Sequence, residues 1–500
     1  MREGRGAALL GSAAIIVGMA LAGRAGAQPA VVDAYRRQLS LHWVADLEGN
    51  PTQMAWGPEG RLYVRTTGKG VHSYAYDRAT GQVSDHKVAV PHDGIGGIGI
   101  AFHGARMYLT EFDGSIHRLD DRNGNGVWGE TAQGELNVAI VTGIPQGDHN
   151  IDQLQVRGDT LFVGIGRRTI NGRRGEWTGG SIDDYGGKGF WAGGIGKTWG
   201  DGAFGGAIAW IQNLDLVADQ QDAANPYSST ALTQFFIQED DSPYRVTDAG
   251  KLIIHSAGTR NPFGLCLDRD GNLWFTNNFN RTQTLGNGES GFGLHGDLLD
   301  SDFSRDVHDQ VFKASEGADY GYADDNWRNK AAMLTPGTPG YHRVLSTTFD
   351  NLFNTGPYTL HDPANPDGLG PSSSSDGCGF FYAFGLPPEL IGNLFITRWN
   401  TTITEAPGGD GDTVRHSLTY SDVVAVDTET GKVRRVAYGF VNPIAVLWDG
   451  AQRLLIADYG SRTLYALRAG RSLGPIRPRS RLPIGPPRPH ERQARGVTKM

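Results

Sequence analysis

Residues 265–275 read LCLDRDGNLWF, two short apolar runs separated by a turn of Asp, Gly and Asn residues. This arrangement is typical of a β-hairpin. The same arrangement recurs in five other segments, at 54–64, 100–109, 154–163, 379–396 and 446–456. A further apolar run follows several of these hairpins, as at 115–119, 423–426 and 463–467. Each repeat is therefore expected to supply about four strands.

Six such repeats predict an all-β fold, a six-bladed β-propeller over residues 28–470, because sheets that close around an axis leave only short, protected edges. Two packed β-sandwiches are the structural alternative. The repeats are unevenly spaced, with long insertions rich in Gly, Asp and Trp at about 169–245 and 276–370. Long connections in a compact fold are often functional, so we expect both insertions to cover one mouth of the propeller.

The composition agrees with a folded chain. The 500 residues include 72 glycines, with 39% hydrophobic and 20% charged residues, which indicates many tight turns and excludes a disordered polymer. The net charge is −8 although both ends are basic, so the body is more acidic than the whole chain and nucleic acid is not an expected partner. The two cysteines, Cys266 and Cys378, are too few for a disulfide scaffold and could be either paired or packed as thiols.

The two ends of the chain differ from the body. Residues 1–27 combine an arginine-bearing start, an apolar stretch and an Ala-Gly-Ala site before Gln28, the pattern of a secretory signal peptide; an uncleaved anchor is the alternative. No later segment has the ~20 apolar residues of a transmembrane helix, so we expect an exported protein, periplasmic or extracellular. Residues 471–500 form a basic, Pro/Arg-rich tail that is predicted to be disordered.

The propeller prediction selects candidate site residues, because residues just before equivalent innermost strands meet near one end of the axis. These positions include His149, Arg260-Asn261, Ser374 and Asn442. A histidine there can act as a general base, and an arginine can stabilise negative charge on a carbonyl oxygen. The alternatives are a hydrogen-bonded channel histidine for His149 and a strand-entry turn for Arg260-Asn261-Pro262.

A second cluster resembles the start of a calcium loop. Oxygen-bearing side chains alternate around glycines at Asp121, Asn123 and Asn125, followed by the Val127 backbone and Glu130. A hard cation takes such carboxylate, amide and backbone oxygens, and so few carboxylates predict weak Ca²⁺ binding. The alternative is a tight Asn-Gly turn at a blade edge. The sequence has no convincing motif of a serine hydrolase, a zinc peptidase or a nicotinamide-binding enzyme.

Several runs resemble the glucose/sorbosone dehydrogenase family of six-bladed quinoprotein propellers. They are Gly147-Asp148-His149-Asn150 leading into 161–166, the run 258–265 and Asp319-Tyr320-Gly321. The Asn-Gly-Asn-Gly sequence at 123–126 is similar to an insertion of the sorbosone-type members. The resemblance extends over most of residues 40–468, apart from the two insertions.

The resemblance implies a sugar or aldehyde dehydrogenase that uses pyrroloquinoline quinone (PQQ) and Ca²⁺, with an electron acceptor that the sequence does not identify. His149 would take the proton of the sugar hydroxyl while hydride passes to the quinone, and Arg260 would stabilise the resulting oxyanion. Asp148 and Tyr320 would contact the substrate. The cofactor-binding residues would be Arg260, Asn261, Ser374, Arg398 and Asn442.

Two other functions stay open. A non-catalytic propeller could bind a glycan or a protein at the channel mouth, favoured by the Trp-rich insertions and by Phe440-Val441-Asn442-Pro443, where the soluble glucose enzymes carry arginines. A metal-dependent hydrolase of the lactonase type should carry several carboxylates at the axial strand starts. Only Asp148 and Asp376 meet that requirement in the sequence.

Overall fold

A computed structural model describes the blades of the protein. The described residues are 28–92, 94–141, 144, 149–166, 206–216, 252–257, 259–278, 309–316, 318–319, 346–347, 369, 374–404 and 417–470. The predicted signal peptide and tail, most of both insertions, Asp148 and Tyr320 lie outside them. Within the described part, no helix is long and apolar enough to cross a membrane.

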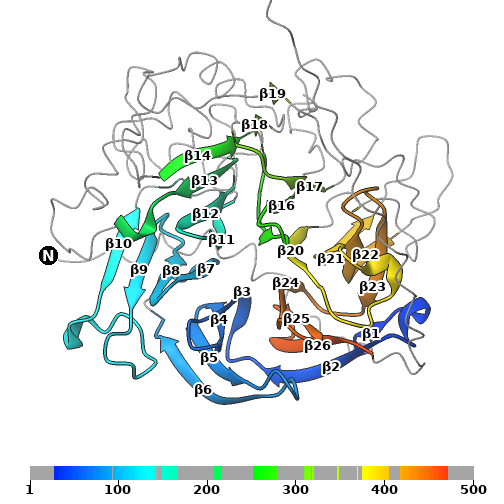
Figure 1. Cartoon of the computed structure of the whole chain (residues 1–500), viewed down its shortest axis with the longest axis horizontal. Helices are drawn as coiled ribbons and strands as arrows, with labels where there is room; N and C mark the ends of the chain where they lie inside the picture. The colour runs from blue at the N-terminus through cyan, green and yellow to red at the C-terminus, as the bar shows by residue number, and fades with distance from the viewer. Residues whose placement is uncertain are drawn as a thin grey trace, which may run out of the picture.

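Six sheets surround a central axis, as predicted (Figure 1). Taken in the order of the ring, and from the axis outward, their strands have the following bounds. The first blade contains β3 (Asn50–Trp56), β4 (Leu62–Thr67), β5 (Gly70–Tyr76) and β6 (Val83–Val90), and the second contains β7 (Ile100–His103), β8 (Arg106–Thr110), β9 (Ile116–Asp120) and β10 (Asn137–Val141). The third blade contains β11 (Ile151–Arg157), β12 (Thr160–Ile165), β13 (Ala207–Ile211) and β14 (Leu252–Ala257), extended by β18 (Ala318–Asp319) and β19 (Ser346–Thr347), and the fourth contains β15 (Leu265–Leu267), β16 (Leu273–Asn277) and β17 (Gln310–Lys313). The fifth blade contains β20 (Ser375–Phe380), β21 (Leu394–Thr404), β22 (Ser417–Val426) and β23 (Val433–Tyr438), extended by β1 (Ala30–Val31), and the sixth contains β24 (Pro443–Trp448), β25 (Arg453–Asp458), β26 (Thr463–Ala469) and β2 (Leu39–Asp46).

The ring is closed. Each innermost strand contacts the next, in the order β3, β7, β11, β15, β20, β24 and back to β3. The N-terminal strand β2 pairs antiparallel with β26 near the C-terminus, from Leu39 opposite Ala469 to Asp46 opposite Thr463. This pairing ties the two ends of the propeller into one blade and excludes the two-sandwich alternative.

The hydrophobic core lies between neighbouring blades. One buried cluster joins β4 and β5 to β8 and β9 through Tyr63, Val71, Met107 and Leu109. Others lie between the blades of β12 and β16, of β16 and β20, of β21 and β25, and of β25 and β4. Each strand alternates its side chains between two such interfaces, which explains the short, two-sided apolar runs of the sequence.

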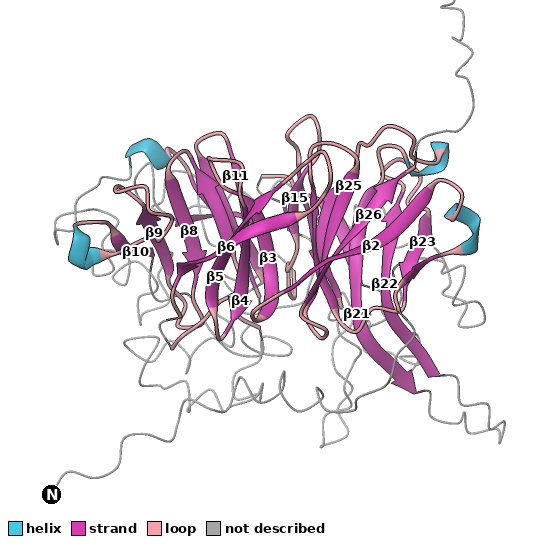
Figure 2. Ribbon diagram, turned by 90° about the horizontal axis from the view of Figure 1, so that it is seen from below, coloured by secondary structure: helices cyan, strands magenta, loops and turns pink. Residues whose placement is uncertain are grey.

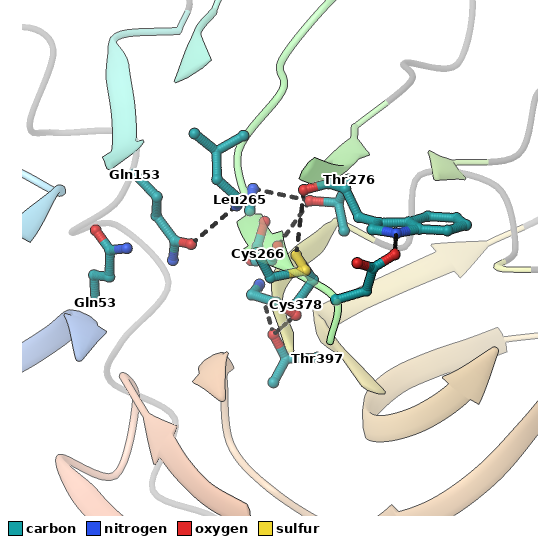
Figure 3. Close-up of a disulfide and its surroundings, with 12 residues drawn as sticks. Gln53, Gln153, Leu265, Cys266, Thr276, Cys378 and Thr397 are labelled. Carbon is teal, nitrogen blue, oxygen red and sulfur yellow. Dashed lines mark hydrogen bonds between the residues drawn. A yellow bond between two sulfur atoms is a disulfide. The ribbon is translucent and has the colours of Figure 1, made fainter. Parts of the chain in front are cut away.

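Polar side chains link the innermost strands. The Thr110 hydroxyl accepts from the Gly99 amide and donates to the Asp152 carbonyl of the next blade, and Thr276 joins Gly264 to Asp376 in the same way. The Gln53 side chain accepts from the Ile100 and Leu154 amides. Gln153 on the innermost strand β11 accepts in the same way from the Leu265 amide of the next blade (Figure 3).

A disulfide between Cys266 and Cys378 resolves the alternative left by the sequence (Figure 3). It joins β15 to β20, the innermost strands of the fourth and fifth blades. The two residues are 112 positions apart and are buried among Trp274, Val311 and Phe380.

The segments treated as insertions also supply blade strands. β13 lies within 169–245 and pairs with β12, while β17 lies within 276–370 and pairs with β16. The short 3-10 turns are η1 (Asp33–Tyr35), η2 (Thr131–Gln133), η3 (Leu214–Leu216) and η4 (Pro388–Leu390). In the side view, the strands run from one face of the ring towards the other (Figure 2).

Candidate functional site

The antiparallel topology defines which residues meet at one end of the axis. The starts of the innermost strands and the ends of the second strands lie at the same end, because each such pair is an antiparallel hairpin. His149 precedes β11, Arg260-Asn261 precede β15, Ser374 precedes β20 and Asn442 precedes β24. We call this end the axial mouth.

His149 and Asn261, from neighbouring blades, meet beside Gly166 at the end of β12. A Cβ atom at Gly166 would lie 2.2 Å from His149 Cβ and 2.6 Å from Asn261 Oδ1. The Gly166 amide also donates to the carbonyl of Asn150 (2.9 Å), which fixes this residue against the strand start that carries His149. The segments that carry His149 and Asn261 are therefore neighbours across one glycine.

Arg260 is held by the end of β16. Asn277 Oδ1 accepts from the backbone amides of both Arg260 (2.9 Å) and Asn261 (3.1 Å), and its own Nδ2 donates to Gln310 Oε1 (3.1 Å). The Arg260 guanidinium donates through Nη1 to the Asn278 carbonyl (3.2 Å). Arg260, Asn261 and Asn277 are all buried, so this part of the mouth has a fixed shape.

Ser374 joins the same network from the fifth blade. Its hydroxyl donates to Asp376 Oδ1 (3.1 Å), which also accepts from Asn278 Nδ2 (2.9 Å). The Asn278 amide in turn donates to the Asn261 carbonyl (2.9 Å). The structure thus brings His149, Arg260, Asn261 and Ser374 to one place.

Two half-buried aromatic residues continue the mouth to the sixth blade. The Trp399 amide donates to the Ser374 carbonyl (3.0 Å), and the Trp399 ring packs on Tyr459 with centroids 5.1 Å apart. The Tyr459 amide donates to the Asn442 carbonyl (2.8 Å), and the Asn442 amide donates to Asp458 Oδ1 (2.7 Å). Asn442 therefore lies on the rim, separated from Ser374 by this aromatic pair.

The guanidinium of Arg398 is engaged inside its blade. It forms two hydrogen bonds to Asp422, of 2.8 and 2.7 Å, and a third to the carbonyl of Leu369 (2.9 Å). Both charged side chains of this ion pair are fully buried. Arg65 on β4 is likewise paired with buried Glu111 at 2.6 Å. These contacts give Arg398 and Arg65 structural partners within and between blades.

Two carboxylates are buried just below the mouth. Asp376 has its pKa raised to about 8, chiefly by burial and secondarily by the charge of Asp309, against hydrogen bonds from Asn278 and Ser374 that lower it. Burial, followed by the charge of Asp376, raises the pKa of Asp152 well above its ordinary value. Asp152 is only 1% exposed and Asp376 3%.

The predicted calcium loop is an ordered turn. Asp121 Oδ2 accepts from the Gly126 amide, Asn123 Oδ1 from that of Asn125, and Asn125 Oδ1 from that of Val127. Glu130 Oε2 accepts from Asn125 Nδ2 (2.6 Å), and the Lys87 ammonium donates to the Asn125 carbonyl (3.4 Å). Within the described residues, no group of three or more His, Cys, Asp or Glu side chains is arranged to hold a metal. Ca²⁺ binding at this loop stays a prediction.

The sequence reasoning missed residues at the ends of the second strands. Gly166, Asn277-Asn278 and Tyr459 lie at these ends or directly after them, and the hairpin pattern could have located them by counting from the turn. Trp399 lies inside β21. Asp152 was missed because it lies inside β11. The pairing of β11 with β12 shifts register between Ile151 and Leu154, a bulge that re-aims the side chains of this segment.

The closed ring of six sheets makes this protein a six-bladed β-propeller. No protein-family model matches the chain, and no curated protein matches its sequence. Similar solved structures include a carbohydrate-active enzyme of family AA12 from Trichoderma reesei, in a calcium form with a TM-score of 0.54 at 13% identity, over 90% of this chain and 98% of that chain. The iodide form gives a TM-score of 0.52 at 13% identity, over 90% and 99%.

A further similar structure is the holo form of the pyranose dehydrogenase PQQ domain from Coprinopsis cinerea, with a TM-score of 0.49 at 13% identity, over 88% of this chain and 97% of that chain. At these identities the likeness is one of fold. The likeness to the two AA12 structures agrees with the six-bladed propeller that the blades themselves show.

Proposed function

We propose that this protein is an exported PQQ-dependent dehydrogenase of sugars or aldehydes. The observation that carries the proposal is the meeting of His149 with Asn261 beside Gly166 at the axial mouth, with Arg260 directly before Asn261 and held by Asn277. A general base next to a cationic oxyanion site is the pair that oxidation of a hydroxyl to a carbonyl requires.

The donor set at the mouth fits the carbonyl edge of a quinone. A guanidinium, an amide and a hydroxyl, from Arg260, Asn261 and Ser374, can hold carbonyl and carboxylate oxygens. Arg65 and Arg398 form ion pairs with Glu111 and Asp422 in the blades, whereas Arg260 lies at the mouth next to Asn261, so its position makes it the arginine that we assign to the cofactor. When bound, the quinone would supply the acceptor for a hydride from the substrate carbon.

Proton transfer and charge stabilisation are assigned to residues of the chain. His149 accepts the proton of the substrate hydroxyl at Nε2. Arg260 stabilises negative charge on the oxygen that faces it, and Asn277 keeps Arg260 in position through its two backbone hydrogen bonds. Trp399 and Tyr459 offer apolar ring surface at the rim, on which a sugar ring can pack.

The experiment is cofactor titration of the purified protein by calorimetry with PQQ and Ca²⁺, followed by dye reduction with a panel of aldoses. We expect saturable quinone binding, and a turnover that falls by about 10² to 10⁴ in His149→Ala. His42→Ala, which removes an exposed histidine on β2, is the matched control. Absence of quinone binding would replace this proposal by the glycan- or protein-binding propeller, and metal-dependent lactone hydrolysis would replace it by the hydrolase.

Export is supported by the Cys266–Cys378 disulfide, since such bonds persist mainly in oxidising compartments. The test is N-terminal sequencing of protein recovered from the periplasm or the medium. A mature protein that begins at Gln28 is expected, and a chain that retains residues 1–27 in the membrane fraction would contradict the proposal.

A further inference from the structure

The connection between β20 and β21, residues 381–393, carries exposed apolar side chains at the end of the propeller opposite the axial mouth. Phe384 is 63% exposed and Ile391 is 62% exposed. In the same connection, Leu386 and Leu390 are buried in the core cluster between the fifth and sixth blades. The connection is thus anchored in the core while two of its large apolar side chains stay in water. We call residues 381–393 the apolar connection.

The last described residue of the chain lies against the apolar connection. Gly470 follows β26, and its amide donates to the Gln38 carbonyl. A Cβ atom at Gly385 would overlap the carbonyl oxygen of Gly470, so Gly470 touches the residue next to Phe384. The chain therefore leaves the sixth blade at the apolar connection, and the tail, residues 471–500, follows from there.

The first part of the tail has the composition to cover such a surface. Residues 473–476 read LGPI and residues 482–484 read LPI, so both runs place aliphatic side chains beside a proline. Proline favours the extended polyproline II conformation, which docks on aromatic side chains at a low cost in entropy. An extended chain spans about 3.3 Å per residue, so Leu473 and Ile476 reach about 10 and 20 Å from Gly470. The first run is therefore within reach of Phe384.

Covalent attachment distinguishes the tail from other occupants of this surface. A segment that is joined through a few residues has a local concentration of about 10⁻³ M. A segment that binds as a free peptide with a Kd of about 10⁻⁴ M is therefore docked about ten times as often as not when it is tethered. A second copy of the chain would have to reach such a concentration in bulk in order to compete.

We propose that the first part of the tail, residues 471–484, docks on the apolar connection of its own chain, with Leu473 and Ile476 against Phe384 and Ile391. The docking withdraws exposed apolar surface from water, which is the main driving force of such contacts. It also secures the end of β26, the strand that closes the ring with β2. The apolar connection lies away from the axial mouth, so this proposal does not depend on the proposed function.

The experiment is limited trypsin digestion of the full chain, with cleavage rates measured by mass spectrometry. Arg479 and Arg481 lie within the proposed segment, whereas Arg492 and Arg495 follow it and serve as the internal reference. Trypsin cleaves a docked segment only when it opens. We therefore expect cleavage after Arg479 and Arg481 to be about tenfold slower than at the two reference sites. A synthetic peptide of residues 471–500 corrects the four rates for their local sequence.

Variants on both sides of the contact test its location. Phe384→Ser should remove the tenfold protection, and so should the pair Leu473→Ser, Ile476→Ser in the tail. All three substitutions together should have no further effect, because they remove the same contact. The exposed position of Phe384 means that its replacement should leave the fold intact, and the tail variants change no blade strand. Trp43→Ser is the matched control, since Trp43 is an aromatic residue of β2 that is 62% exposed, and it should retain the protection.

Equal corrected rates at all four arginines of the wild type would overturn the proposal, as would protection that survives Phe384→Ser. Loss of protection in Trp43→Ser alone would assign the tail to β2 instead of the apolar connection. Protection that grows with protein concentration would identify a second copy of the chain as the occupant. Each of these three outcomes rejects docking within one chain on the apolar connection, and none of them changes the test of quinone binding.

Discussion

Gly166→Ala tests the central juxtaposition of the mouth. Its new Cβ would lie 2.2 Å from His149 Cβ, whereas non-bonded carbon atoms normally stay about 3.5–4.0 Å apart, so His149 or Asn261 must move by more than about 1 Å. A displacement of this size in a catalytic group can cost about 10²-fold in rate. The overpacking itself should destabilise the fold by about 1–3 kcal/mol.

The assay for Gly166→Ala combines quinone titration, dye-reduction kinetics and thermal unfolding. Gly379→Ala is the matched control, because its nearest contact is the side-chain atom Val446 Cγ2 at 3.1 Å, in the fifth blade and away from the mouth. Neither glycine has a positive φ, so packing alone distinguishes the two variants. Wild-type quinone affinity and turnover in Gly166→Ala would refute the reasoning that places His149 and Asn261 together across this residue.

Three other predictions concern the frame of the propeller. Arg398→Ala should lower the free energy of unfolding by about 1–3 kcal/mol, measured by urea denaturation, because it removes two hydrogen bonds to buried Asp422, which keeps Arg435 at 2.7 Å as an ion-pair partner. Arg398→Ala, Arg435→Ala, which leaves Asp422 without either arginine, should cost about 3–5 kcal/mol, and equal losses in the single and double variants would contradict this shared pairing. Replacing Cys266 and Cys378 by alanine should cost up to about 5 kcal/mol, since the bond closes a loop of about a hundred residues, and unchanged denaturation would reject this estimate. Burial raises the pKa of Tyr108 to about 12, above the ordinary value of about 10 for a tyrosine. The neutral phenol therefore contributes about 2–3 kcal/mol to the stability of the fold below pH ~10, and this contribution is lost as the pH rises towards 12. Ultraviolet titration that shows ionisation of Tyr108 near pH 10 in the folded protein would contradict this prediction.

The hairpins could be predicted from the sequence because their information is local. In 265–275, Asp268 Oδ1 accepts from the amides of Asp270 and Asn272, and Oδ2 accepts from the indole of Trp274. Such turn chemistry is carried by residues within a few positions of one another. The apolar runs on both sides then had to be adjacent strands, and they are β15 and β16.

Long-range partners could not be predicted in this way. Nothing near Arg398 in the sequence indicates Asp422 as its partner, and the pairing of β2 with β26 joins opposite ends of the chain. Asp152 was overlooked because side chains of a regular strand alternate strictly between its two faces, and the sequence-based prediction assumed this alternation. The bulge between Ile151 and Leu154 in β11 interrupts the alternation at this residue. The positions missed at the mouth therefore depend on register, which a single sequence specifies weakly.

The buried ion pairs explain how arginines can lie inside the blades of this propeller. Arg65 is paired with Glu111 and Arg398 with Asp422, so each buried guanidinium has a carboxylate partner in its own or the neighbouring blade. Arg260 is held differently, because its main chain is fixed by Asn277 and its Nη1 donates to the Asn278 carbonyl. The mouth therefore presents a positioned guanidinium, the group that suits carbonyl and carboxylate oxygens of a ligand.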